Sequence, residues 1–267
     1  MEHLVAIPVY NEEQYVDVVL REVRKHTADV LVVDDGSTDA TPQRLAAMEG
    51  IFRITHPENR GYGQSLIDAF CFAARRGYDW IITMDCDEQH EPSRIPHFIA
   101  EAEKNQADII SGSRYLQTLP DNSMPPSDRR AINARITRLL NDVLGLSLTD
   151  AFCGFKAYRV EALRRLRLTV PGYAMPMEFW VQAVRAGLRI VETPVRLIYK
   201  DPTRHFGGSL DDPEARVNYY LDVFVSELAN DAYLNPSADP CRQSGRQSGR
   251  QSGRQSGRQS GTTTRQC

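Results

Sequence analysis

The sequence predicts an α/β protein with a mostly parallel central sheet and helices on both faces. Apolar, β-branched runs at residues 3–8, 30–33, 51–55, 79–84 and 108–112 are typical of buried strands. Segments with helical spacing of apolar residues lie between them, at 16–23, 64–76 and 92–105. Repeated strand–helix units of this length favour parallel strands joined by helical crossovers. Ligands bind such a sheet at the carboxyl ends of its strands.

Local signals predict where several of these elements begin and end. Asn11, followed by Glu12 and Glu13, is expected to cap the first helix, because asparagine is a good N-cap and acids suit the helix dipole. The last strand, 189–199, is interrupted by Pro194, so we expect it at an edge of the sheet. Further helices are expected at 129–144, at 160–166 and around Glu178, whereas 117–128 is polar, without periodicity, and is either a lid or a surface excursion.

The end of the fourth predicted strand carries a candidate metal site. Asp85 and Asp87 alternate where the strand stops, Gln89 follows two residues later, and Pro92 ends any strand. Two carboxylates beside an amide oxygen suit Mg²⁺ or Mn²⁺, whose coordination is usually completed by water and substrate phosphates. An isolated Asp-x-Asp pair is more often a solvated turn, so this interpretation depends on the rest of the chain.

Two other strand ends carry candidate binding residues. Asp35 lies in an Asp-Asp-Gly-Ser segment, which is also what a simple turn would contain. Residues 59–63 form a glycine-rich loop that leads into a helix, and such a loop lets the backbone approach an anionic ligand. Pro8, Asp35 and Asp85 all fall at the carboxyl ends of predicted parallel strands, where a common site would form.

Six motifs in this order resemble the family 2 glycosyltransferases: 7–12, 32–39, 59–63, 84–92, 111–115 and 150–157. The resemblance extends from about residue 4 to about residue 206. It is closest to the branch that contains dolichol-phosphate mannose synthase and polyprenyl-phosphate glycosyltransferases. It implies the GT-A nucleotide-sugar-binding fold and a metal-dependent, inverting transfer of a hexose.

The resemblance also implies roles for individual residues. Asp85, Asp87 and Gln89 would hold Mg²⁺ or Mn²⁺. The carboxylate of Asp35 would bind the base or ribose of the nucleotide. The remaining residues expected to bind the nucleotide-sugar are Pro8, Tyr10, Glu12, Arg60, Gly61, Asp85, Arg114, Glu178 and Lys200. Asp87, Asp150 and Arg204 are the expected catalytic residues, although Asp150 could instead cap a turn.

The implied reaction moves a hexose, from GDP-mannose or a UDP-hexose, to a polyprenyl phosphate. An acceptor phosphate is already a nucleophilic anion and needs no strong base, whereas a sugar hydroxyl would need one, with Asp150 as the first candidate. Arg129 and Arg130 either face solvent or meet an anionic acceptor. A nucleotidyltransferase and a non-catalytic nucleotide-binding module are the other classes considered. The first would place a basic glycine-rich loop after the first strand, where Asn11, Glu12 and Glu13 stand instead.

Composition fits a protein that works in a reducing compartment. The chain has 267 residues and a formal charge of −3, and the 35 acidic residues outnumber the 32 basic ones. An acidic body argues against nucleic acid as a partner. The 5 cysteines have no metal-like spacing, which favours reduced thiols.

We expect no signal peptide and no membrane-spanning helix. A cytoplasmic enzyme follows, peripheral at the inner membrane face or held there by an anchoring partner protein.

Three segments are expected along the chain. Residues 1–211 would form the catalytic domain, and 212–235 an amphipathic helix that packs on it, because its polar face is acidic rather than basic. Residues 236–267 would be a disordered tail, most of it an Arg-Gln-Ser-Gly repeat. The arginines of this tail either contact an anionic bilayer or have no function.

Overall fold

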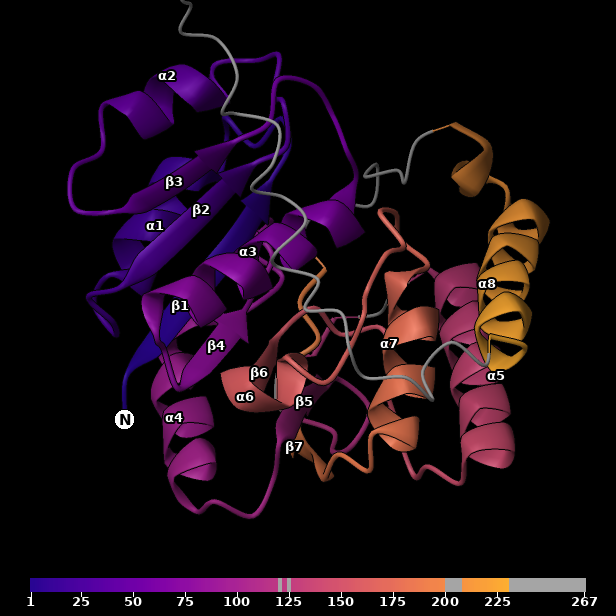
Figure 1. Ribbon diagram of the computed structural model, residues 1–267. Helices are drawn as coiled ribbons and strands as arrows, with labels where there is room; N and C mark the ends of the chain where they lie inside the picture. Colours follow the sequence, from indigo (N-terminus) through magenta and orange to yellow (C-terminus); the bar gives the residue numbers. More distant parts are fainter. Residues whose placement is uncertain (120–121, 124–125, 200–207, 231–267) are drawn as a thin grey trace, which may run out of the picture.

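The computed structural model describes residues 1–119, 122–123, 126–199 and 208–230 (Figure 1). A seven-stranded sheet with the order β3-β2-β1-β4-β6-β5-β7 forms its centre. The strands are β1 His3–Val9, β2 Val30–Asp34, β3 Phe52–Thr55, β4 Trp80–Thr83, β5 Ile109–Ser113, β6 Lys156–Arg159 and β7 Ile190–Pro194. Neighbouring strands are parallel, except that β6 runs antiparallel to β4 and β5. The predicted α/β class with a mostly parallel sheet is confirmed.

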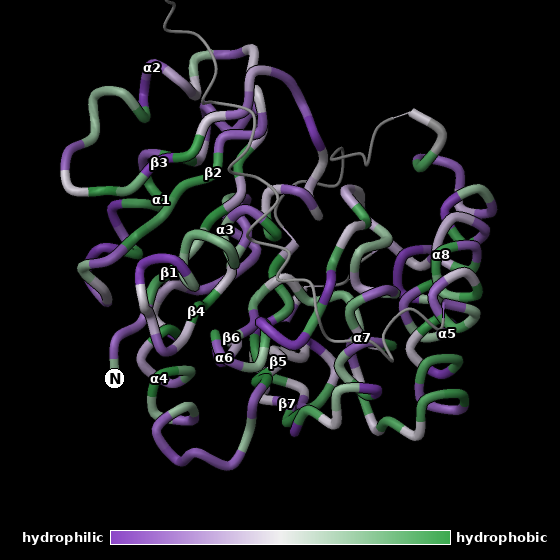
Figure 2. Tube along the Cα trace, viewed as in Figure 1, coloured by the Kyte–Doolittle hydropathy of each residue, from purple (hydrophilic) through white to green (hydrophobic). Residues whose placement is uncertain are grey.

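Helices cover both faces of the sheet. They are α1 Val16–Val23, α2 Thr41–Ala46, α3 Tyr62–Arg76, α4 Ile95–Glu103, α5 Ser127–Leu144, α6 Val160–Leu163, α7 Met175–Arg185 and α8 Pro213–Leu228. Successive strand residues face opposite sides, so β1 sends Leu4 and Ala6 to one core and Val5 and Ile7 to the other. The first core contains α3, α5, α7 and α8, and the second contains α1 and α4. Strands β2 and β4 are accordingly hydrophobic in Figure 2.

The strand order places a crevice at the carboxyl end of β1. From β1 the chain adds β2 and β3 on one side and then crosses to β4 on the other. Where the direction of winding reverses in this way, the loops after the two central strands separate and leave room for a ligand. Tyr10 follows β1 and Asp85 follows β4 by two residues, so both lie at this crevice.

Strand β6 was not predicted, and it brings a distant segment against the metal motif. The hydroxyl of Thr83 at the end of β4 donates a 2.8 Å hydrogen bond to the carbonyl of Gly154, just before β6. A Cβ atom on Gly154 would lie 2.4 Å from Oδ2 of Asp85. Glycine is therefore required at position 154, because this backbone approaches the Asp85 carboxylate more closely than any side chain allows.

Helix α8 packs on α5 and α7 at one end of the molecule (Figure 1). Its inner face contributes Val217, Tyr220 and Phe224, all of which are buried. Its final carbonyl groups accept hydrogen bonds from the guanidinium of Arg185 on α7, at 2.8 to 3.0 Å. Arg185 thus satisfies carbonyl groups that a helix end leaves without partners, and it joins α8 to α7.

Several element bounds differ from the sequence-based expectations. Asn11 does not cap a helix: its φ is 56°, its side chain accepts a 2.8 Å hydrogen bond from the N–H of Thr38, and α1 begins at Val16. Strand β7 pairs only with β5, as expected of an edge, but it ends at Pro194 instead of reaching residue 199. Helix α2 was not predicted. Its six residues are too few to show a helical period.

The sequence led us to expect reduced cysteines and no membrane-spanning helix, and the described residues bear on both expectations. Cys71, Cys86 and Cys153 are buried within this part of the chain, and no disulfide joins them. In the same residues, no helix combines the length and the hydropathy needed to cross a membrane.

Candidate functional site

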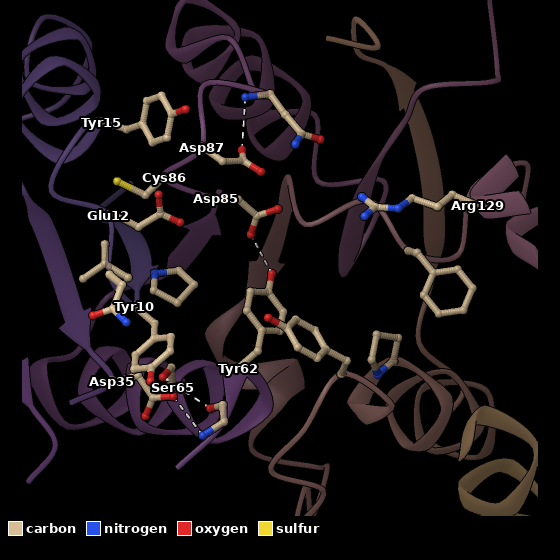
Figure 3. Close-up of a pocket in the computed structure, with 18 of the residues that line it drawn as sticks. Tyr10, Glu12, Tyr15, Asp35, Tyr62, Ser65, Asp85, Cys86, Asp87 and Arg129 are labelled. Atoms are coloured by element: carbon tan, nitrogen blue, oxygen red, sulfur yellow. Dashed lines mark hydrogen bonds between the residues drawn. The ribbon is translucent and has the colours of Figure 1, made fainter. Parts of the chain in front are cut away.

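A cleft of about 980 Å³ opens along the carboxyl ends of β1, β2 and β4 (Figure 3). Side chains from α3, α5 and α8 complete its walls. Most of the residues that the sequence singled out line it: Pro8, Tyr10, Glu12, Asp35, Gly61, Asp85, Asp87, Gln89 and Arg114. The cleft therefore lies where the rule for parallel sheets predicts it, at the carboxyl ends of the strands.

Glu12, Asp35, Asp85 and Asp87 lie together on one side of the cleft, called the acid end below (Figure 3), and Glu13 and Asp39 also line the cleft. The loops after β1 and β2 are fixed to each other there. The N–H of Asn11 donates to Oγ of Ser37 at 2.9 Å, and the N–H of Glu12 donates to Oγ1 of Thr41, also at 2.9 Å. These bonds join two motifs that are separate in sequence, 7–12 and 32–39, into one wall of the cleft.

Asp35 is buried in this wall, where three hydrogen bonds hold its carboxylate. Oδ1 accepts from the N–H of Arg60 at 2.9 Å and is 2.6 Å from Nδ1 of His56, and Oδ2 accepts from the N–H of Gly61 at 2.8 Å. Gly61 has a φ of 101°, which a side chain would rarely adopt. A carboxylate offers about four acceptor positions, so Asp35 retains capacity for a ligand N–H or O–H.

Arg60 contributes to the cleft through its backbone. Its side chain is about half exposed, and Nη1 lies 3.6 Å from Oδ2 of Asp68 at the rim. Asp68 also lies 2.9 Å from Nε2 of His56, so His56 bridges two carboxylates beneath the loop. Arg60 is not among the residues that line the cleft, but its N–H group orients Asp35; the expected contact of Arg60 with the nucleotide-sugar stays a prediction.

The metal motif forms a tight turn at the end of β4. Glu88 has a φ of 56°, and the N–H of Gln89 donates to Oδ1 of Asp87 at 3.1 Å. Asp85 accepts a 2.8 Å hydrogen bond on Oδ1 from the hydroxyl of Tyr62, drawn as a dashed line in Figure 3. Burial, followed by the nearby charge of Asp85, raises the pKa of Tyr62, so its hydroxyl remains a donor.

The donor set at this turn fits a hard divalent ion that shares its coordination with a substrate. Asp85, Asp87 and Gln89 present carboxylate and amide oxygens to the cleft. Within the described residues, no three His, Cys, Asp or Glu side chains gather into a complete metal cage. Mg²⁺ typically needs no such cage, because one or two carboxylates, waters and substrate phosphates suffice.

The other end of the cleft, called the arginine end, is lined by Arg114, Arg129 and Arg216. Arg129 reaches into the cleft from the side opposite Asp85 and Asp87 (Figure 3). Arg114 lies over the ring of Tyr115 at 5.7 Å and Arg129 over that of Tyr199 at 5.6 Å. Further aromatic side chains that line the cleft are Phe152, Tyr173 and Tyr220. This end is suited to an anion attached to an apolar group.

Asp150 lies behind this wall, and its side chain is completely buried. Oδ2 accepts from Nε of Arg114 at 2.6 Å, and Oδ1 accepts from a terminal nitrogen of Arg114 at 2.9 Å and from Nδ2 of Asn133 at 2.8 Å. Burial by itself would raise the pKa of Asp150, but the Arg114 charge, the hydrogen bonds from Arg114 and Asn133 and the Lys156 charge together outweigh burial and lower this pKa to about 2. Asp150 therefore orients Arg114 and is too weak a base to accept a proton from a substrate.

Glu178 does not line the cleft, although the sequence suggested that it would. Its buried carboxylate accepts hydrogen bonds from the N–H groups of Thr169 and Val170 at 2.8 to 2.9 Å. Burial raises its pKa despite these bonds. Glu178 thus stabilises the loop before α7. The expected residues Lys200 and Arg204 lie outside the described residues.

Sequence reasoning missed two residues that shape the cleft. Tyr62 lies within the glycine-rich motif, between Gly61 and Gly63, and its ring stacks on that of Tyr173 with the centroids 5.7 Å apart. Arg216 lies on α8, where the amphipathic pattern alone gave no reason to single it out. The sequence did contain a signal for each residue. Tyr62 lies between two glycines, and Arg216 shares the spacing of the apolar residues on the buried face of α8.

Comparisons with known proteins support the sequence resemblance. Residues 4–167 match the family described as Glycosyl transferase family 2. An undecaprenyl-phosphate mannosyltransferase of Micrococcus luteus is 33% identical over 212 residues, which cover 75% of this chain and 85% of that protein. A polyprenol monophosphomannose synthase of Mycolicibacterium smegmatis is 29% identical over 204 residues, which cover 72% and 76%.

A solved structure shows the same fold. It is glucosyl-3-phosphoglycerate synthase of Mycobacterium tuberculosis in complex with Mn²⁺, UDP-glucose and phosphoglyceric acid, with a TM-score of 0.65 at 19% identity over 85% of this chain and 80% of that chain. The expected GT-A fold is therefore confirmed. By the extent of the sequence match and the fold, the chain belongs to glycosyl transferase family 2.

Proposed function

We propose that this glycosyltransferase moves a hexose from a nucleotide-sugar to a polyprenyl phosphate, with inversion at the anomeric carbon. The observation that carries the proposal is the separation of charge within one cleft, with carboxylates at one end and arginines at the other. Two relatives support the acceptor class, since their names describe an undecaprenyl-phosphate mannosyltransferase and a polyprenol monophosphomannose synthase. Such an acceptor lies in a bilayer, so the enzyme would work at a membrane surface.

The acid end is the proposed donor site. Asp35 would accept a hydrogen bond from the base or ribose, and Pro8, Tyr10 and Glu12 would form the adjoining wall. Asp87 and Gln89, with Asp85 oriented by Tyr62, would hold Mg²⁺ or Mn²⁺ against the diphosphate. When bound, the ion would stabilise the negative charge that develops on the departing nucleoside diphosphate.

The arginine end is the proposed acceptor site. Arg114 and Arg129 would bind non-reacting phosphate oxygens, because guanidinium groups match phosphate geometry. One further oxygen of the acceptor would form the bond to the anomeric carbon. The bond from that carbon to the diphosphate oxygen would break, and its electron pair would leave with the nucleoside diphosphate. Inversion follows, because attack and departure occur on opposite faces of the sugar.

Asp150 favours a phosphate acceptor over a sugar hydroxyl. A hydroxyl acceptor needs a base to take its proton, and Asp150 was the leading candidate. Its carboxylate is buried behind the cleft, bound to Arg114 and Asn133, and its pKa is about 2. A phosphate acceptor loses no proton to the enzyme, so the reaction would proceed without a base in this position.

The proposed function is tested by offering the full chain a panel of labelled nucleotide-sugars, with Mn²⁺ and a polyprenyl phosphate. We expect label from one donor to enter the lipid-soluble product, with the nucleoside diphosphate released in equal amount. A parallel reaction contains an oligosaccharide acceptor in place of the lipid. Label that enters only the oligosaccharide would overturn the phosphate acceptor and favour transfer to a sugar hydroxyl.

We predict that Asp87→Ala lowers kcat at least a hundredfold, because loss of the ion's charge stabilisation removes several kcal/mol at the transition state. The measurement is transfer rate against Mn²⁺ concentration, with EDTA as the zero point. Glu88→Asn is the matched control, since it removes a neighbouring carboxylate but tolerates the left-handed backbone at position 88. Activity of Asp87→Ala in EDTA equal to that of the wild type in saturating Mn²⁺ would refute the metal assignment.

We predict that Asp35→Asn weakens binding of the nucleoside diphosphate about tenfold or more, because one acceptor oxygen at the cleft wall becomes a donor. Calorimetry with the nucleotide alone measures this loss. Asp68→Asn removes the other carboxylate partner of His56 without altering the lining of the cleft. Equal losses in the two variants would show that His56 packing, and not contact with Asp35, determines nucleotide affinity.

We predict that Asp150→Asn destabilises the fold by about 3–5 kcal/mol at neutral pH, because Arg114 loses its buried partner. The folded-state pKa of about 2 lies below the unfolded value of about 3.9, so ionised Asp150 stabilises the fold above about pH 4. This contribution disappears as the pH falls toward 2. Urea unfolding at a series of pH values measures the difference between wild type and variant, which should be constant from pH 5 to 8.

Asp108→Asn is the control for this experiment. Hydrogen bonds from Arg189 hold the pKa of Asp108 at about 2 as well, but Asp108 lies away from the cleft. We expect it to lose stability without a change in acceptor KM, whereas Asp150→Asn raises acceptor KM. If the wild-type transfer rate rises with pH between pH 5 and 8 and this rise disappears in Asp150→Asn, Asp150 acts as a base and our assignment is wrong.

A further inference from the structure

Arg216 is a charged residue on the buried face of α8. It lies one helical turn before Tyr220 and two turns before Phe224, and the three residues are only 3% to 4% exposed. Residues four apart share a helix face, so Arg216 occupies a position where this helix otherwise places core side chains. Burying a guanidinium is costly unless charged or polar groups compensate it. Its location therefore calls for a reason other than hydrophobic packing.

An ion pair with α5 accounts for part of this compensation. A terminal nitrogen of Arg216 lies 3.2 Å from Oδ2 of Asp128, and the Asp128 side chain is 46% exposed. A half-exposed carboxylate is well solvated, and its attraction for a partner is correspondingly reduced. Asp128 also directly precedes Arg129 in the first turn of α5, so one carboxylate charge is shared between two nearby arginines.

Arg216 also lines the cleft, at the same end as Arg114 and Arg129. These three arginines come from the loop after β5, from α5 and from α8. Among the described lining residues at this end there is no carboxylate, while Asp150 and Asp128 stand behind the wall. Three like charges around one cavity repel one another, and a phosphate group entering it would relieve that repulsion.

We propose that Arg216 binds the phosphate of the acceptor and so makes α8 part of the acceptor site. The inference rests on the proposed function and adds a specificity-determining residue to it. Arg216 lies beyond residues 4–167, the part of the chain that matches the family. The ligand class is a phosphate monoester on an apolar chain, because Phe152 and Tyr220 pack together at 4.9 Å beside the arginines.

The test compares Arg216→Gln with Asp128→Asn in the full chain, by steady-state transfer to a polyprenyl phosphate. If Arg216 contacts the acceptor phosphate, Arg216→Gln raises acceptor KM about 10- to 100-fold, as expected for one charged hydrogen bond, and leaves donor KM unchanged. Asp128→Asn breaks the same ion pair but keeps the guanidinium, so its acceptor KM stays within twofold of the wild type. Equal increases in the two variants would overturn the proposal and make Arg216 a clamp between α8 and α5.

Two further arms make the result decisive. Inorganic phosphate is tested as a competitive inhibitor, and its inhibition constant should rise in Arg216→Gln as acceptor KM does. A loss confined to the long-chain lipid would mean that Arg216 acts on the chain or the bilayer, which overturns phosphate recognition. Arg185→Gln loosens the far end of α8 without altering the lining of the cleft, so an equal increase in its acceptor KM would assign the effect to helix docking.

Failure of the inference can be told apart from failure of the proposed function. A wild type that transfers no sugar to any prenyl phosphate refutes the proposed function itself. A wild type that transfers, together with an Arg216→Gln variant of unchanged acceptor KM, refutes only the role of Arg216. Should Arg216→Gln fold poorly, Arg216→Lys keeps the charge and the apolar stem but loses the planar fork, and an intermediate increase in acceptor KM is then expected.

Discussion

The arginine end of the cleft depends on one buried ion pair, between Arg114 and Asp150. A buried charge is tolerated only when its partners satisfy it. Here two bonds join the guanidinium to the carboxylate, and Asn133 and the N–H groups of Arg114 and Phe152 also donate to it. The pair joins the loop after β5 to α5 and to the segment before β6. It holds Arg114 at the cleft wall, and removing either charge would leave the other buried and uncompensated.

The two ends of the cleft are built in different ways. At the acid end, Tyr10, Asp35 and Asp85 each come one or two residues after a parallel strand, so the sheet itself places them together. At the arginine end, only Arg114 directly follows a strand, β5, whereas Arg129 and Arg216 belong to helices α5 and α8. Tertiary packing assembles them, through the Asp150 network and the docking of α8 against α5 and α7.

This difference explains what could be predicted from the sequence. The positions of Pro8, Asp35 and Asp85 followed from a rule that connects a place in the chain with an edge of the sheet. The role of Glu178 did not, because its partners are the backbone groups of Thr169 and Val170, and no periodicity reveals which way a buried acid points.

Short elements and long-range contacts were similarly hidden. Strand β6 has four residues, Lys-Ala-Tyr-Arg, and its antiparallel place between β4 and β5 could not be inferred from so short a pattern. Asn11 has the sequence context of a helix cap, but its side-chain oxygen accepts hydrogen bonds from Thr38 and Asp39. These partners belong to the loop after β2, so the sequence around Asn11 does not reveal them. Local propensity was outweighed in each case by a partner distant in sequence.

The charge separation also bears on how one cleft distinguishes two substrates that both carry phosphate. A bare diphosphate would be repelled from the acid end, where Glu12, Asp35, Asp85 and Asp87 lie, and the proposed donor would enter there because a divalent ion accompanies it. The arginine end attracts a bare phosphate and would repel that ion. In the proposed reaction, the ion therefore directs the diphosphate to one end and leaves the other to the acceptor. This arrangement would place the sugar between its leaving group and the attacking oxygen.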